Sequence, residues 1–296
     1  MKRFLLSLCL LPSLVEAETN SLEFVEEAHF SLTFDEAKSA SPGQVKWVEQ
    51  GLKGRAGYFD GEKHLIRLKH ELGNAVRTIA LWFSPGESID HRIEVARSLL
   101  MRNTSTEQGE FGLYLCPTIW RHPGKLVFTR RIRGQRFEVA SERDRWIRGQ
   151  WYHVVALLDE ETGMQLYIDG ERQPMKHDNG APTDRRNEVV SLGSWGDKRM
   201  RFFHGTLDEV HIWRRALTPL EIKSLYFSYK PPDQTPDVSK EAMAELVERL
   251  GSTDRRERKR ARNQLKALGF PTLLMLEPFQ DHDDPEIRIT VRELLR

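Results

Sequence analysis

Tryptophan and arginine side chains are interleaved in the middle of the chain, and together they have the chemistry of a binding surface. Trp120 and Trp146 flank a basic group that includes Arg131 and Arg133, and Trp195 follows further along. An aromatic face can stack on a sugar ring, and arginine makes two-pronged contacts with carboxylate or sulfate oxygens. We predict these five residues as exposed ligand contacts. Core packing of the tryptophans and a solvated loop surface remain the alternatives.

Signatures of nucleophilic or metal-dependent catalysis are missing from the sequence. The histidines are scattered without a His-Glu-x-x-His spacing, and no serine lies in a Gly-x-Ser-x-Gly turn. Cys116 is followed by Pro117 rather than by a base, and there is no glycine-rich phosphate loop. A lone cysteine of this kind is more often a small buried hydrophobic residue. We expect no enzymatic activity.

The densest charge in the chain is a basic run near its end. Its members are Arg255, Arg256, Arg258, Lys259, Arg260, Arg262 and Lys266. A helix with such a face can contact the phosphates of a nucleic acid. Acidic neighbours favour instead a solvated, salt-bridged face, and these are Glu241, Glu245, Glu248 and Glu257. We expect no nucleic-acid partner.

The overall composition is that of a globular chain without a dominant charge. Its 296 residues are 39% hydrophobic and 30% charged, and 45 basic side chains against 44 acidic ones leave a net charge of +1. An apolar fraction of this size can build a core. The near-neutral balance lacks the positive field of a general nucleic-acid binder.

Residues 1–17 predict a signal peptide. Two basic residues precede an apolar run from Phe4 to Leu11, and Val15 and Ala17 occupy the −3 and −1 positions of a cleavage site. No later run approaches the ~20 apolar residues that span a bilayer. We therefore expect a secreted, periplasmic or cell-surface protein without a transmembrane segment. Cleavage after Ala17 leaves Cys116 as the one cysteine, so no internal disulfide is expected.

Residues 23–229 predict an antiparallel two-sheet β-sandwich. Short segments alternate apolar and polar side chains between turn residues, as in Thr78–Ser84 and Trp151–Asp159. Phe202–Thr206 and Leu207–Trp213 are predicted as two successive strands, and Asp169-Gly170 predicts a tight hairpin turn. The predicted fold class is mainly β, with a small all-α region after the sandwich.

A proline-rich linker over residues 230–237 separates the sandwich from that helical region, residues 238–296. Three prolines in eight residues exclude a helix or a central strand in the linker. Beyond it, apolar residues recur at helical spacing in four short segments, and Asp254 and Asp284 are placed to cap two of them. The sequence therefore predicts a small helical domain at this end.

Five segments of the predicted sandwich follow one another in a recognisable order. They are Gly54–Gly61, Thr78–Phe83, Gly149–Ala156, Leu166–Glu171 and Phe203–Trp213 with the following Arg215–Ile222. Together they resemble the laminin G-like (type 3) jelly roll of the concanavalin A-like lectin/glucanase superfamily, over about residues 24–229. The resemblance implies a jelly-roll sandwich that binds carbohydrate or glycoprotein. It also implies calcium held by Asp35 and Asp208, unless Asp208 merely accepts backbone N–H groups.

The hydrolases of that superfamily place three alternating acids on one strand, so that two carboxylates flank the scissile bond. Here Glu142 and Asp144 are followed by Trp146 where the third acid would stand, which argues against a glycoside hydrolase.

The segments Leu265–Pro271 and Asp283–Arg288 resemble HEAT-like repeats over about residues 237–296.

Taken together, the signal peptide, the missing catalytic signatures and the resemblance of the sandwich predict a secreted, non-catalytic protein that recognises carbohydrate or glycoprotein. The alternative is a protein–protein interaction or scaffolding module of a cell-envelope assembly.

Overall fold

The computed structural model describes residues 23–35, 45–68, 76–102, 111–132, 135–174, 190–195, 200–229, 239–268 and 272–295. Contacts divide the chain into two compact units, Glu27–Leu217 and a second unit that combines Met1–Glu26 with Thr218–Arg296. The predicted signal peptide and linker lie outside the described residues. Within the described ranges, no helix has the length and apolarity needed to cross a bilayer.

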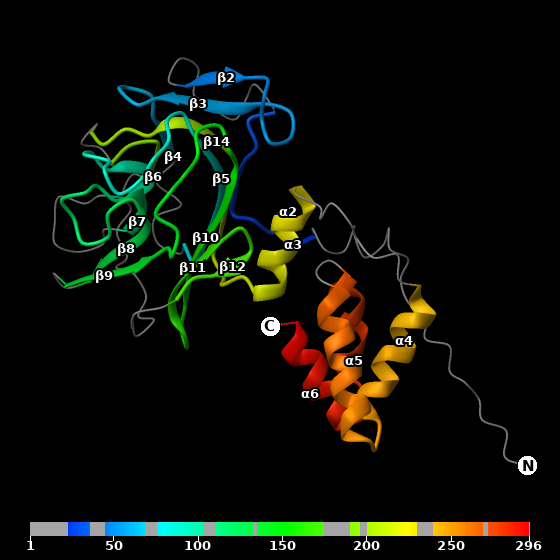
Figure 1. Cartoon of the computed structure of the whole chain (residues 1–296). Coiled ribbons are helices and arrows are strands. Elements are labelled where there is room, and N and C mark those ends of the chain that lie inside the picture. The colour runs from blue at the N-terminus through cyan, green and yellow to red at the C-terminus, as the bar shows by residue number, and fades with distance from the viewer. Residues whose placement is uncertain are drawn as a thin grey trace, which may run out of the picture. The chain divides into compact units, whose positions relative to one another are not determined.

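Two antiparallel sheets form the first unit (Figure 1). The strands of one sheet are β1 Phe30–Leu32, β2 Lys46–Val48, β3 Ala56–Asp60, β5 Thr78–Pro85, β10 Tyr152–Asp159, β11 Gly163–Ile168, β12 Glu171–Arg172 and β14 His204–Trp213. Their order is β12-β11-β10-β5-β14-β3-β2, with β1 also paired to β14.

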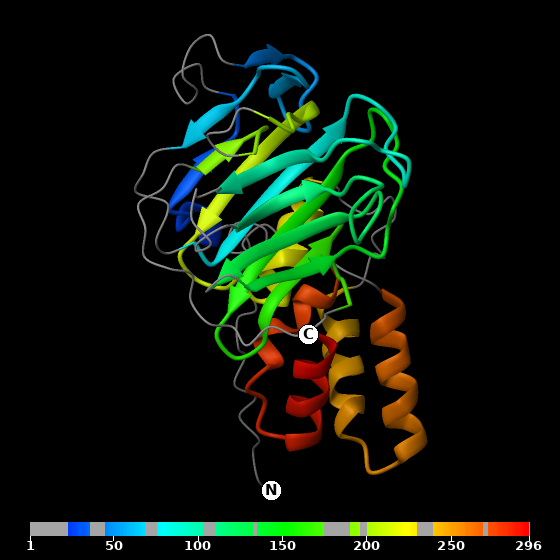
Figure 2. The same ribbon diagram turned by 90° about the vertical axis from the view of Figure 1, so that its left-hand side faces the viewer.

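The second sheet has six strands, whose neighbours lie side by side in Figure 2. They are β4 Ile66–Leu68, β6 Arg97–Arg102, β7 Phe111–Leu115, β8 Leu126–Ile132, β9 Gln135–Ala140 and β13 Val190–Leu192. Their order is β4-β13-β6-β7-β8-β9, and every pairing is antiparallel.

The main core fills the space between the two sheets. Leu81 and Phe83 of β5 pack there with Leu113 of β7 and Phe128 of β8, and all four are buried. Burial of this apolar surface is the dominant stabilising contribution. The predicted mainly-β, two-sheet sandwich is confirmed.

Several features of the strands differ from the sequence prediction, and β2 is among the strands that were not predicted. The segments predicted as two strands with a break after Thr206 form one strand, β14, because its pairing with β5 continues through Thr206 and Leu207. A β-bulge follows between Asp208 and His211. Strand β6 was not predicted, since Leu99, Leu100 and Met101 form an unbroken apolar run and its pairing with β7 also shifts register. The hairpin between β11 and β12 is confirmed, with φ of 51° at Asp169 and 78° at Gly170.

The second unit is helical. Its described elements are α2 Glu23–Glu26, α3 Pro219–Tyr229, α4 Lys240–Glu248, the 3-10 helix η3 Arg249–Gly251, α5 Arg255–Leu268, the 3-10 helix η4 Thr272–Phe279 and α6 Pro285–Leu294. Val247 of α4, Leu265 of α5 and Val291 of α6 are fully buried in one apolar cluster. Amphipathic helices too short to be stable alone are held by such packing.

Helices α5 and α6 begin in the same way. Asp254 accepts the N–H of Arg256 at 2.8 Å, and Asp284 accepts the N–H of Glu286 at 2.8 Å. In each helix an arginine one turn further on reaches back to the preceding loop. Arg258 donates to the carbonyl of Ser252 at 2.7 Å, and Arg288 donates to that of His282 at 2.6 Å. The same capping pattern therefore recurs within this unit.

Candidate functional site

The face of the six-stranded sheet that is turned away from the main core carries its own cluster of side chains. Along β7, Leu113 enters the main core, whereas Tyr114 and Cys116 lie on the opposite face because side chains alternate across a strand. Val127 of β8 packs with them, and Glu138 of β9 meets Tyr114 on that side. We call this surface the outer face.

Three aromatic rings meet on the outer face. The ring of Tyr114 lies 5.5 Å from that of Trp120 and 5.3 Å from that of Trp195, and the two indoles are 5.9 Å apart. The Arg201 guanidinium lies 4.6 Å from the Trp120 ring and 4.2 Å from the Trp195 ring. Edge-to-face aromatic pairs and cation–π contacts of this kind hold the rings in fixed positions.

Two adjoining hollows lie beside this cluster along β9. Their volumes are about 560 and 210 Å³, and they share the lining residues Arg121, His122, Arg136 and Glu138. Trp120 lines the smaller hollow, and the larger extends toward Lys125 and Glu142. We call the pair the β9 groove. It combines a partly exposed indole, an excess of basic side chains and carboxylate acceptors.

The carboxylate of Glu138 lies close to three polar side chains of the β9 groove. Its Oε1 accepts the Tyr114 hydroxyl at 2.9 Å, and its Oε2 lies 3.7 Å from His122 Nε2. Arg136 Nη1 lies 4.0 Å from Glu138 Oε1. Burial, together with this carboxylate, holds the pKa of Tyr114 far above its usual value, so the phenol stays a neutral donor. Burial also raises the pKa of the Cys116 thiol to about 11.

The structure brings together some of the predicted ligand contacts. Trp120 and Trp195 are neighbours on the outer face, and Arg131 of β8 stands opposite Arg136 of β9 in the strand register. Trp120 is partly exposed, but the expectation that Trp195 is exposed is wrong, because only 4% of it is accessible beside Tyr114. Arg133 lies outside the described residues.

Trp146 departs from the prediction in both place and exposure. It is 1% exposed and packs against Phe83 and Tyr152 at ring distances of 5.2 and 4.9 Å. Its indole N–H donates to the Gly124 carbonyl at 2.8 Å. The polar neighbours of Trp146 in the sequence suggest a loop, but a β-bridge to Ile89 turns the indole into the main core.

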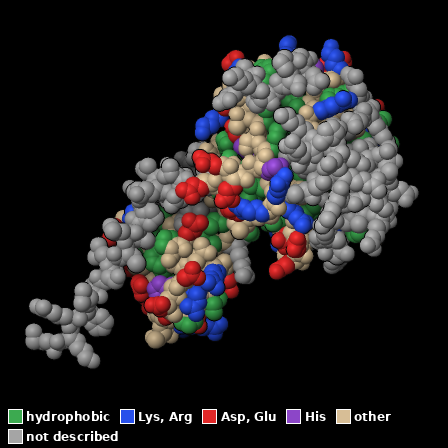
Figure 3. Space-filling model, turned by 180° about the vertical axis from the view of Figure 1, so that it is seen from behind, with side chains coloured by type: hydrophobic (Ala, Val, Ile, Leu, Met, Phe, Trp, Pro, Cys, Tyr) green, Lys and Arg blue, Asp and Glu red, His purple; other side chains and the backbone are tan. Residues whose placement is uncertain are grey.

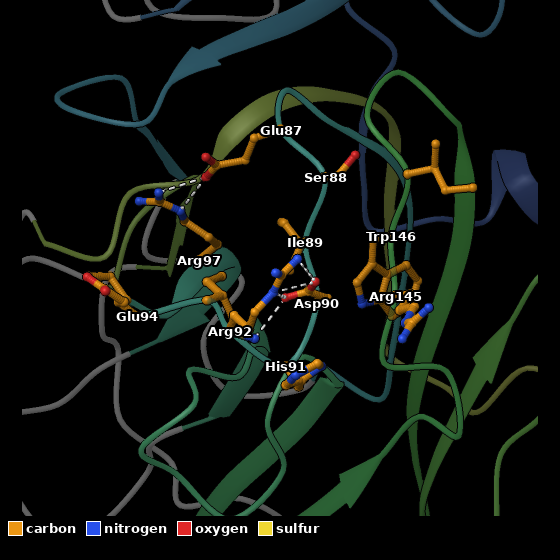
Figure 4. A pocket seen from close by; sticks show the side chains of 13 residues that line it. Glu87, Ser88, Ile89, Asp90, His91, Arg92, Glu94, Arg97, Arg145 and Trp146 are labelled. Atoms are coloured by element: carbon orange, nitrogen blue, oxygen red, sulfur yellow. Dashed lines mark hydrogen bonds and ion pairs between the residues drawn. The ribbon is translucent and has the colours of Figure 1, made fainter.

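A third hollow of about 790 Å³ lies where residues 87–97 face residues 145–147 (Figure 4). Two ion pairs lie among the residues 87–97 that line it, Arg97 to Glu87 at 2.7 Å and Arg92 to Asp90 at 2.6 Å. The hydrogen bonds from Arg92 lower the pKa of Asp90 to about 2. Its lining also includes the exposed aliphatic side chains Val95 and Ile147. We call it the loop pocket, and its charges are mostly neutralised in pairs.

Comparison with known proteins identifies the family of the sandwich. A family model described as the concanavalin A-like lectin/glucanases superfamily, laminin G type 3, matches residues 60–223, which is more than half of the chain. The chain belongs to this superfamily. A stretch of 80 residues is 32% identical to the human (Homo sapiens) adhesion G-protein coupled receptor D1, and it covers 26% of this chain and 9% of the receptor. The chain thus spans under a tenth of the length of that relative.

Several solved structures share the fold of the sandwich. The binding domain of Paraclostridial Mosquitocidal Protein 1 is 18% identical with a TM-score of 0.54, over 70% of this chain and 53% of that one. Domain 4 of AbnA, a GH43 extracellular arabinanase from Geobacillus stearothermophilus in complex with arabinotriose, is 19% identical with a TM-score of 0.51, over 68% and 97%. The receptor binding domain of botulinum neurotoxin D is 11% identical with a TM-score of 0.53, over 69% and 53%. These likenesses show the fold.

The calcium that the superfamily resemblance implies can be tested against the two predicted ligands. Asp208 accepts the N–H groups of Leu52 and Glu209, each at 2.9 Å, and Asp35 accepts that of Arg55 at 2.9 Å. Burial raises the pKa of Asp208 to about 7. Calcium needs six to eight oxygens, and no group of three potential metal-ligating side chains occurs in the described part of the chain. These residues fit backbone bonding by Asp208 rather than a calcium site.

A serine, a histidine and a glutamate of the sandwich are joined by hydrogen bonds, and these are the residue types of a nucleophile, a base and an acid. Ser31 Oγ lies 2.9 Å from His211 Nδ1, whose ring Nε2 lies 3.1 Å from Glu209 Oε2. The sequence analysis did not predict this contact, because Ser31 and His211 are 180 residues apart. Ser31 stands opposite His211 in the β1–β14 register. Hydrogen bonding of a buried imidazole accounts for the contact.

The sequence analysis also did not predict several side chains in and beside the β9 groove. Tyr114, His122 and Glu138 of the groove were not predicted as site residues, and neither was Arg201, which packs on Trp120. The alternation along β7 and β9 places Tyr114 and Glu138 opposite to the core residues Leu113 and Val139, so strand parity is the signal that finds them.

Proposed function

We propose that this protein is a secreted, non-catalytic binding protein that recognises carbohydrate or glycoprotein in the β9 groove. The observation that carries the proposal is the partly exposed Trp120 at the edge of a groove lined by Arg136 and Glu138. A sugar ring stacks on an indole face, while its hydroxyls need both donors and acceptors close by. The groove supplies all three.

The charge of the β9 groove favours a sugar that carries carboxylate or sulfate. Four basic or imidazole side chains face two carboxylates, and these are Arg121, His122, Lys125 and Arg136 against Glu138 and Glu142. Arginine is suited to such oxyanions because its fork matches their geometry. Arg131, opposite Arg136 in the sheet, extends the basic surface.

A glycan array probed with the mature chain tests the proposal. Arg136→Gln removes a donor from the groove, and Arg148→Gln removes an exposed arginine from elsewhere as the matched control. We expect Arg136→Gln to weaken retention by roughly tenfold, the cost of a lost charged hydrogen bond, and Arg148→Gln to leave it unchanged. Equal retention of both variants contradicts the groove.

Two further arms sharpen this experiment. Trp120→Ala tests stacking, with Trp47→Ala on the other sheet as the control for losing an indole. Calcium and chelator are compared on the same array, and we expect no difference because Asp35 and Asp208 are occupied by backbone N–H groups. Calcium-dependent retention would restore both residues as metal ligands.

A secreted, periplasmic or cell-surface location rests on the predicted signal peptide. N-terminal sequencing of the exported protein should start at Glu18, because Ala17 occupies the −1 position.

The loop pocket favours a second candidate function, binding of a protein partner in a cell-envelope assembly. Val95 is 49% and Ile147 is 60% exposed on its rim, and Ile119, at 80%, adjoins Thr118, whose N–H donates to the carbonyl of Ile93 in the lining. Exposed aliphatic side chains gathered on one surface are typical of protein contacts. Capture of a partner that Ile119→Ser and Ile147→Ser abolish, with glycan retention intact, would favour this function.

We infer that the helices from α4 to α6, in the segment of about residues 237–296, are a pair of HEAT-like repeats. The support is the recurrence of one capping pattern at Asp254 and Arg258 and again at Asp284 and Arg288, thirty positions apart. Repeated units of this kind bury a shared core by stacking on their neighbours.

A further inference from the structure

The outward side of helix α5 carries five basic side chains and no acidic one. Its exposed positions there are Arg255, Arg256, Lys259, Arg260, Asn263 and Lys266. At 3.6 residues per turn they lie opposite Ala261 and Leu265, which are fully buried. The side chains from Arg255 to Lys266 extend over about 16 Å at 1.5 Å per residue. We call this surface the basic strip.

Two of the acidic neighbours, Glu248 and Glu257, pair with His282 and Arg249 rather than with the basic strip. Glu257 pairs with Arg249 at 3.4 Å, and the two remaining arginines of α5 pair with acids of α6. Arg262 lies 2.7 Å from Glu293, and Arg258 lies 3.9 Å from Glu286. Arg258 and Arg262 are therefore salt-bridged, but to acids of α6 rather than to the predicted acidic neighbours. In the described part of the chain, no ion pair reaches any of the five basic side chains of the strip.

Charges of one sign along a helix have a cost that a ligand can remove. Arg255 and Lys259, like Arg256 and Arg260, are four residues apart, a spacing at which like charges repel and weaken a helix. Acidic side chains of the helical unit lie on α4 and α6. Figure 3 shows acidic and basic side chains on the surface of this unit. An anionic polymer laid along the strip would neutralise the repulsion and release counterions.

We propose that the basic strip binds an anionic polysaccharide through contacts to carboxylate or sulfate groups spaced along its chain. The strip contains no apolar side chain, which insertion into a lipid surface requires. It contains no aromatic side chain, on which single-stranded bases stack. Residues 60–223 of the same chain match the lectin/glucanase superfamily. The proposal concerns a separate surface and does not rest on the β9 groove.

Charge-neutralising variants of the mature chain test the proposal. Arg255→Gln, Lys259→Gln and Lys266→Gln are combined in one protein. Lys46→Gln, Lys53→Gln and Lys63→Gln, exposed lysines of the sandwich, form a control with the same net charge. Binding to heparin and to polygalacturonate is measured at several salt concentrations. We expect the strip variant to bind at least about tenfold more weakly, with a salt dependence reduced by about two to three counterions, and the control to match the wild type.

Each other outcome overturns the proposal. Equal loss in both triple variants shows a general effect of net charge, and unchanged binding of the strip variant shows that the strip is not a site. Tighter binding of polyglutamate or duplex DNA at matched charge assigns the strip to another class of partner. The groove variant Arg136→Gln separates the two proposals, since it should keep the salt-dependent binding of long polymers to the strip. Circular dichroism checks that every variant is folded.

Discussion

Asp208 is a carboxylic acid held inside a strand, and its environment makes stability depend on pH. The residue is fully buried, and burial raises its pKa from 3.8 to about 7. Between these values the folded state binds a proton that the unfolded state has lost, so stability falls as pH rises from 4 to 7. Asp208→Asn removes the charge. At about 1.4 kcal/mol per pKa unit, we expect the variant to gain roughly 2 kcal/mol or more over the wild type between pH 4 and pH 8.

Urea unfolding at several pH values measures that difference. The comparison with wild type separates the contribution of Asp208 from that of His153. Both residues stand opposite Trp82 of β5, on its two neighbouring strands. Burial lowers the pKa of His153 to about 3, so its contribution has the opposite sign and is lost as pH falls below 6.5. A stability difference that stays constant with pH would show that Asp208 does not titrate in this range.

Cys116 should be a poor nucleophile in the folded protein. Its thiol is buried, and its pKa is raised from 9.0 to about 11, which lowers the thiolate fraction near neutral pH about a hundredfold. We expect iodoacetamide to modify the mature chain at least a hundredfold more slowly in buffer than in urea, as followed by mass spectrometry. Comparable rates in the two solvents would place the thiol at the surface.

At the scale of elements, the arginines that close the start of α5 and α6 should stabilise the helical unit equally. Arg258 donates to the carbonyls of Ser252 and Thr253, and Arg288 to those of His282 and Asp283. We expect Arg258→Ala and Arg288→Ala each to cost about 1–2 kcal/mol, the usual range for a charged hydrogen bond that is partly exposed. Helical circular dichroism during urea unfolding measures the loss.

Arg256→Ala is the control for both variants, because Arg256 lies in α5 like Arg258 but is exposed, and no contact of this kind is found for it in the described part of the chain. If Arg258→Ala and Arg288→Ala differ from each other by more than either differs from the control, the two capping patterns are not equivalent and the repeat interpretation fails.

The elements that sequence predicts well are those whose signals are local. Hairpin and capping residues act within a few positions, so Asp169-Gly170 and the caps Asp254 and Asp284 appear where their chemistry places them. Strand β14 does not follow a simple alternation of buried and exposed side chains, because its bulge changes the face of every side chain after it.

The site is harder to predict than the elements, since its residues meet across strands that are distant in sequence. The environment of Trp146 is polar along the chain but apolar in space, because a bridge to Ile89 turns it into the core. Trp120 and Trp195 are brought together by the sheet and by Arg201, a contact that no local pattern reveals. Exposure is a property of the packed molecule, so residue type alone predicts it poorly.

At the scale of the whole molecule, the two proposed binding surfaces predict that affinity depends on the length of the glycan. A short oligosaccharide reaches the β9 groove alone, whereas a long anionic chain can also occupy the basic strip, and the second contact is then intramolecular. We expect the affinity per sugar to rise at least about tenfold from a tetrasaccharide to a long heparin chain for the wild type. The variant Arg255→Gln, Lys259→Gln, Lys266→Gln should lose most of that rise but keep its tetrasaccharide affinity, whereas the lysine control of the sandwich should keep both. Calorimetry on a series of chain lengths measures this. An equal rise in all three proteins would mean that length acts through repeated groove sites on the polymer, and that the two surfaces of the chain do not bind the same molecule.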